Sequence, residues 1–102
     1  MLDAEFLTSI AAQLMTSTSV SVDGQSVTVR RTSQQRLRAA AFRVGSHEYQ
    51  AIEQNPEKPS RWGQLAKRGR QVVQFKDAES NKFIAVVVAG KVTFYGHSKE
   101  RL

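Results

Sequence analysis

The sequence predicts a single α+β domain, in which two helices pack on a curled antiparallel sheet of about five to seven strands. The chain has 102 residues, of which 40% are apolar, and this is the size and composition of one globular domain. Two segments carry apolar residues at helical spacing, and a third segment fits either a helix or a hairpin. Most other segments alternate apolar with polar residues or are continuously apolar, as strands are. Partial closure of the sheet into a small barrel would remove its exposed edges. We expect all 102 residues to form this one domain.

The first helix is predicted over residues 4–15, and the first hairpin over residues 19–31. Asp3 can cap the helix, and its apolar stripe consists of Phe6, Leu7, Ile10, Ala11 and Leu14. The hydroxyl run at residues 16–19 then favours a connector over another helical turn. In the hairpin, valines alternate with polar residues around Asp23-Gly24, the pair that a type I′ turn requires.

Residues 34–54 can be interpreted in two ways. As a hairpin, strands 36–44 and 47–54 flank a Gly45-Ser46 turn. As a helix, the segment begins at Ser33 and ends at Gly45, and three successive alanines favour this interpretation. We favour the hairpin, because the strand after Ser46 needs a partner and the nearest one precedes it.

A short second helix over residues 61–68 and a three-strand meander over residues 71–95 complete the predicted domain. Ser60 can cap this helix and Gly69 can end it. Trp62 is expected to anchor the helix on the sheet, because so short a helix is unstable alone. The tail at residues 97–102 is expected to be mobile.

Charge gives the main functional signal. Fifteen Lys and Arg against nine Asp and Glu give a net charge of +6, which favours encounter with nucleic acid. No acidic residue lies between Gly24 and His47, so the arginines there need distant carboxylates such as Glu48 and Glu53, or an external polyanion. We predict a small basic module that binds DNA or RNA phosphates with little base specificity. The predicted contacts are Arg36, Arg38, Arg43, Arg61, Arg68 and Arg70.

The alternative function is a protein-interaction or homo-oligomeric module, whose apolar C-terminal hairpin "FIAVVVAGKVTFY" offers an interface edge. No catalytic or cofactor motif is visible, so we expect neither an enzyme nor a cofactor. "DAESN" at residues 77–81 opens like a calcium loop, but Lys82 and Val88 occupy positions that need glycine and glutamate. His47 and His97 lack a ligand motif, so no metal site is predicted. The absence of cysteine and of a signal or membrane segment predicts a cytoplasmic protein without membrane contact.

Overall fold

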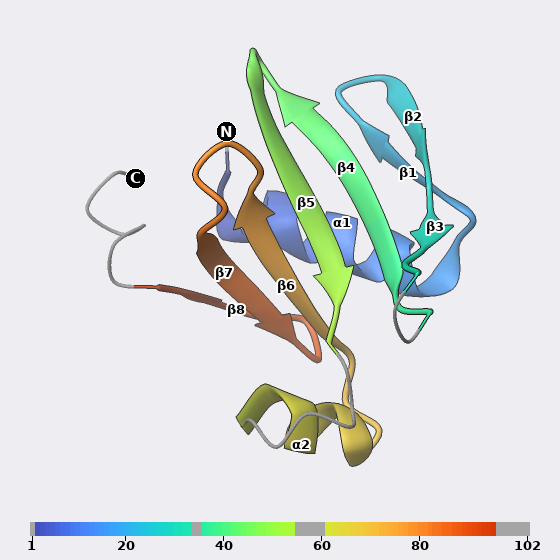
Figure 1. The fold of residues 1–102 in the computed structure, drawn as a ribbon, viewed down its shortest axis with the longest axis vertical. Coiled ribbons are helices and arrows are strands. Elements are labelled where there is room, and N and C mark those ends of the chain that lie inside the picture. The colour runs from blue at the N-terminus through green and yellow to red at the C-terminus, as the bar shows by residue number, and fades with distance from the viewer. Residues whose placement is uncertain (1, 34–35, 55–60, 96–102) are drawn as a thin grey trace.

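The computed structural model describes residues 2–33, 36–54 and 61–95, with the side chains of Arg61 and Trp62 outside that description (Figure 1). The described chain is an α+β fold with two helices and eight strands. Its elements, in chain order, are α1 (Ala4–Thr16), β1 (Ser19–Val22), β2 (Gln25–Thr28), β3 (Arg30–Arg31), β4 (Arg38–Val44), β5 (His47–Glu53), α2 (Arg61–Lys67), β6 (Val72–Asp77), β7 (Phe83–Val88) and β8 (Lys91–Phe94).

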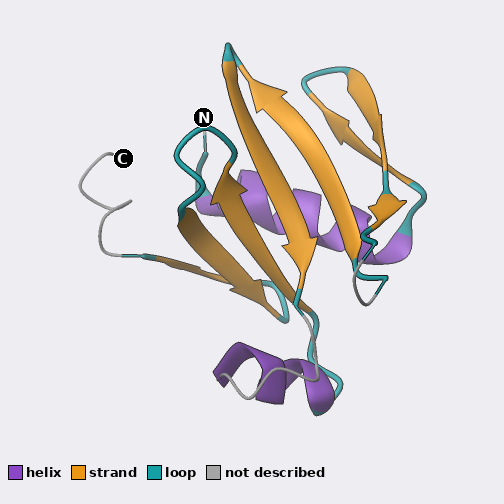
Figure 2. Ribbon diagram, in the orientation of Figure 1, coloured by secondary structure: helices purple, strands orange, loops and turns teal. Residues whose placement is uncertain are grey.

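Helix α1 forms where its cap and apolar stripe predicted it. The Asp3 carboxylate accepts the backbone N–H of Phe6 at 2.8 Å, which satisfies one of the free amides of the first turn. The helix lies across one face of the main sheet (Figure 2), and its buried residues belong to the core beneath that face. These residues are Leu7, Ile10, Ala11 and Leu14.

Strands β1 and β2 form a separate two-stranded sheet, which is shorter than the predicted hairpin. Their turn has positive φ angles of 48° at Asp23 and 80° at Gly24, as a type I′ turn requires. The prediction of one hairpin over residues 19–31 was wrong at its end, because β2 stops at Thr28 and β3 pairs with β4. The change of partner follows Val29, whose N–H donates to the carbonyl of Thr18 at 2.9 Å.

The main sheet is antiparallel and has the order β3-β4-β5-β6-β7-β8. Strands β4 and β5 pair from Ala39↔Ile52 to Val44↔His47, so the ambiguous segment is the hairpin. Its first strand begins at Arg38 rather than at residue 36, because Arg36 has a φ of 53° and cannot continue a strand. The meander β6-β7-β8 matches its prediction, and the sheet stays open, with β3 and β8 as the edges among the described strands.

The core lies between α1 with the β1-β2 hairpin and one face of the main sheet. Phe42 is central to it, with ring centroids 6.3 Å from both Phe6 and Phe75 and 5.9 Å from Tyr49. Helix α2 lies at one end of the sheet, next to β6 (Figure 1). Neither described helix is long and apolar enough to cross a membrane.

Candidate functional site

The fold gathers most of the described cations at one end of the main sheet. The starts of β4, β6 and β8 and the end of β5 share one end, and α2 adjoins it (Figure 1). We call this the basic end; its cations are Arg30, Arg31, Arg36, Arg38, Lys67, Arg68, Arg70 and Lys91. The opposite end holds the β4-β5 and β6-β7 turns, and its charges are mixed: the carboxylates Glu48, Asp77 and Glu79 and the cations Arg43, Lys76 and Lys82.

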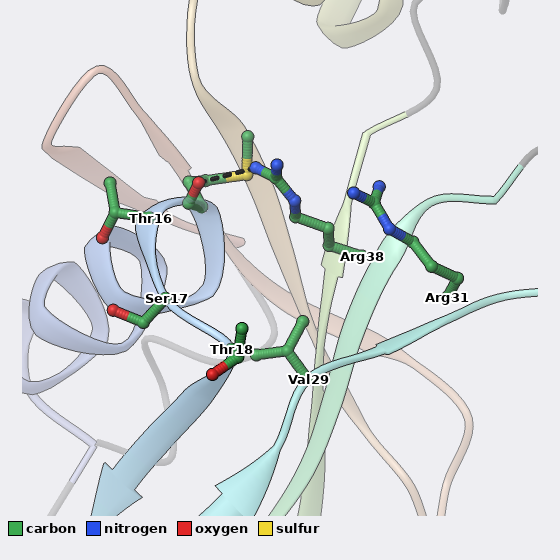
Figure 3. A pocket seen from close by; sticks show the side chains of 7 residues that line it. Thr16, Ser17, Thr18, Val29, Arg31 and Arg38 are labelled. Carbon is green, nitrogen blue, oxygen red and sulfur yellow. Dashed lines mark hydrogen bonds between the residues drawn. The ribbon is translucent and has the colours of Figure 1, made fainter.

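A cleft of about 250 Å³ at the basic end is where two of these arginines meet (Figure 3). Arg31 and Arg38 are directly opposed on β3 and β4, so both side chains leave the same face of the sheet. The C-terminal end of α1 and the connector after it form the other wall. The lining residues are Met15, Thr16, Ser17, Thr18, Val29, Arg31 and Arg38.

Arg38 is held in place by the end of α1. Its Nη1 donates to the carbonyl of Met15 at 2.6 Å, which is one of the last helical carbonyls and has no amide partner within the helix. The cation also interacts favourably with the negative end of the helix dipole. The Glu53 carboxylate accepts the backbone N–H of Arg38 at 3.0 Å, so it contacts the strand rather than the guanidinium.

Arg31 is exposed, and its Nη1 donates to the carbonyl of Arg36 at 3.0 Å. No carboxylate of the described residues lies within 4.0 Å of the guanidinium of Arg31 or of Arg38. Two opposed like charges on neighbouring strands repel each other. An external anion would relieve that repulsion.

A second cleft, of about 190 Å³, also lies at the basic end. It lies between the C-terminal end of α2 and the start of β6, and it shares Met15 with the first cleft. Arg70 lines this cleft, so it lies close to the cluster that contains Arg38. Glu53 is the one carboxylate among the described residues that line either cleft.

Two of the six predicted contact residues lie differently from the prediction. Arg36 was expected in the same strand as Arg38, but it lies in the turn before β4, where its backbone is left-handed. Arg43 lies at the far end of β4, and its Nη1 donates to the carbonyl of Ser46 at 3.1 Å within the β4-β5 turn. Arg43 is also opposite Glu48 in the register, but their charged groups are not within 4.0 Å.

The other predicted residues belong to α2 and the segment after it. Arg68 is exposed just past the helix, and Arg70 is exposed beside the second cleft. The side chain of Arg61 lies outside the described residues, as does that of Trp62, so the predicted anchor is not described. The sequence prediction omitted Arg31 and the hydroxyls of Thr16, Ser17 and Thr18, which only the pairing of β3 with β4 brings to one cleft.

Guanidinium groups and hydroxyls around a shallow cleft have the chemistry to bind phosphate oxygens. Arginine donates two parallel hydrogen bonds to a phosphate, and serine and threonine hydroxyls also serve as phosphate donors. Comparisons of the chain with protein-family models, with curated proteins and with solved structures found no match. Charge and geometry are therefore the basis for proposing a function.

Proposed function

We propose that the protein binds nucleic acid by contacting phosphates with its basic end. The observation that carries this proposal is the gathering of cations around two adjoining clefts whose described lining includes one carboxylate, Glu53. Such a charge distribution attracts a polyanion and raises the rate of its encounter with the protein. Phosphate contacts position a nucleic acid but carry no sequence information, so we expect little base specificity.

The opposed pair Arg31 and Arg38 is the proposed centre of the interface. Arg38 is fixed against the end of α1 and presents a charge in a defined place. Arg31 is exposed, and although its Nη1 donates to the carbonyl of Arg36, its guanidinium has further N–H groups with which to contact a phosphate. Arg70 would contact a neighbouring phosphate, because the cleft that it lines adjoins the first.

The test compares Arg31→Ala with Arg43→Ala in a titration of labelled DNA and RNA oligonucleotides, followed by fluorescence anisotropy. Both variants lose one exposed arginine from the main sheet, and they differ in the end at which it lies. We expect Arg31→Ala to weaken binding and to reduce the salt slope by about one, because one phosphate contact is lost. Arg43→Ala should bind as the wild type does. Equal losses in both variants would show that net charge, and not the basic end, governs binding.

The alternative is self-association through the edge strand β8, which has one sheet neighbour among the described strands. An unpaired edge can add a strand from another chain. Lys91 is exposed at the start of β8, and a charged side chain there hinders such pairing. Absence of oligonucleotide binding, together with a concentration-dependent dimer in light scattering, would favour this alternative.

A further inference from the structure

Three side chains that can ligate a metal meet at the end of the sheet opposite the basic end. His47 is the first residue of β5, Asp77 is the last residue of β6, and Glu79 lies in the turn that follows. The register of β5 with β6, in which Tyr49 is opposite Asp77, brings these distant segments together. One donor atom from each of the three residues lies within 4.8 Å of the others.

Both nitrogens of the His47 ring contact a carboxylate. Nε2 lies 2.9 Å from Asp77 Oδ2, and Nδ1 lies 2.6 Å from Glu79 Oε2. Nε2 is buried, and Oδ2 lies too far from its N–H direction for a hydrogen bond, so this nitrogen has no hydrogen-bond partner. A buried polar nitrogen without a hydrogen-bond partner costs free energy. A carboxylate oxygen lies beside Nε2, but not in the direction in which its N–H would point.

Asp77 is held so that one oxygen remains available to a cation. Its Oδ1 accepts the backbone N–H groups of Glu79 at 2.9 Å and Ser80 at 3.2 Å, which fixes the carboxylate and leaves Oδ2 facing His47.

The ring of Tyr49 lies beside the imidazole of His47, with centroids 4.8 Å apart, so an aromatic ring packs against the histidine at this place.

We propose that His47, Asp77 and Glu79 form a binding site for a divalent transition-metal ion such as Zn²⁺. A metal ion bound to Nε2 lies on the axis that an N–H would take, at about 2.0–2.1 Å, so a second ligand of the same ion must lie off that axis. Oδ2 lies 2.9 Å from Nε2 without forming a hydrogen bond with it, which is the position of a second ligand and not of a proton acceptor. These two atoms are the direct ligands.

Glu79 positions the histidine in this site. A ligating histidine usually donates its other N–H to a carboxylate, which fixes the ring and the tautomer. The Nδ1 contact with Glu79 Oε2 supplies that interaction here. The imidazole ligand favours zinc, cobalt or nickel over magnesium and calcium, and the chain has no cysteine to compete for the ion.

Calorimetric titration of the full chain with Zn²⁺ tests the site, with the two histidines of the sequence as a matched pair. The wild type should bind one ion per chain in a saturable manner, and excess Mg²⁺ or Ca²⁺ should not displace it. His47→Ala should lose at least tenfold in affinity, whereas His97→Ala should keep the wild-type affinity. Absence of saturable binding by the wild type, or loss of binding in His97→Ala instead of His47→Ala, would overturn the proposal.

Two conservative variants separate a metal site from a purely structural ion pair. Asp77→Asn keeps the oxygen that accepts the turn amides and removes the charge, and Glu79→Gln alters a side chain that is 60% exposed. Each should keep the circular dichroism spectrum of the wild type and weaken Zn²⁺ binding about tenfold or more. Wild-type affinity in both variants would contradict the proposed roles of Asp77 and Glu79.

Discussion

Arg31 and Arg38 are directly opposed on neighbouring strands, and we predict that their removal has very different effects on stability. Arg38→Ala removes the 2.6 Å hydrogen bond to the Met15 carbonyl and the favourable interaction with the helix dipole. A hydrogen bond from a charged donor contributes about 1.5–3 kcal/mol, and partial exposure of Arg38 places the expected loss near 2 kcal/mol. Arg31→Ala removes an exposed side chain, and we expect a loss of about 0.5 kcal/mol or less.

Urea denaturation followed by circular dichroism measures this difference in the free energy of unfolding. For a domain of this size, 2 kcal/mol corresponds to a fall in Tm of roughly 10 °C. Arg38→Lys is the matched control, because it keeps the charge near the helix end but loses the geometry of the guanidinium. We expect it to recover part of the lost stability. Equal destabilisation by Arg31→Ala and Arg38→Ala would refute the structural role assigned to Arg38.

Three other predictions concern the fold. Leu14 is fully buried, so Leu14→Ala should reduce the free energy of unfolding in urea by about 2–5 kcal/mol, and a loss below about 1 kcal/mol would argue against its burial between α1 and the main sheet. Gly24 has a φ of 80°, so Gly24→Ala should cost about 1 kcal/mol in the same assay, and an unchanged unfolding midpoint would contradict the type I′ turn. Burial raises the pKa of Asp77, but the contacts of its carboxylate with His47 and with the backbone N–H groups of Ser80 and Glu79 outweigh burial and lower that pKa in the folded state. The ionised carboxylate therefore stabilises the fold above the unfolded pKa of about 3.9, and this contribution is lost as the pH falls through the folded pKa. Acid titration of stability should therefore be steeper in the wild type than in Asp77→Asn, and parallel curves would contradict the shift.

Local sequence patterns predicted the elements whose signals lie within a few residues. The cap and stripe of α1, the Asp23-Gly24 turn and the meander of β6, β7 and β8 are of this kind. The alanine run in β4 shows the limit of propensity, because pairing with β5 overrides its preference for a helix. The change of partner after β2 also depends on a distant strand, so no local pattern revealed it.

The candidate sites show the same division. Arg38 and Arg70 were predicted from the density of charge along the chain, but Arg31 becomes the neighbour of Arg38 only through the pairing of β3 with β4. Arg43 was grouped with Arg38, although five residues of extended strand separate them by about 16 Å. His47 and Asp77 are thirty positions apart in the sequence, so their contact follows from the β5-β6 register and from no motif.

The salt dependence of nucleic-acid binding by the wild-type chain tests the proposed function most directly. We expect about four phosphate contacts, because four arginines lie around the first cleft and its neighbour: Arg31, Arg36, Arg38 and Arg70. Four contacts predict a slope of log affinity against log salt near −3.6 for duplex DNA. Affinity should then fall about a hundredfold between roughly 50 and 200 mM salt. In the double variant with Arg31→Ala and Arg70→Ala, two of these contacts are lost, so the slope should become shallower, near −1.8. No binding at low salt, or an unchanged slope in the double variant, would contradict phosphate recognition by the basic end.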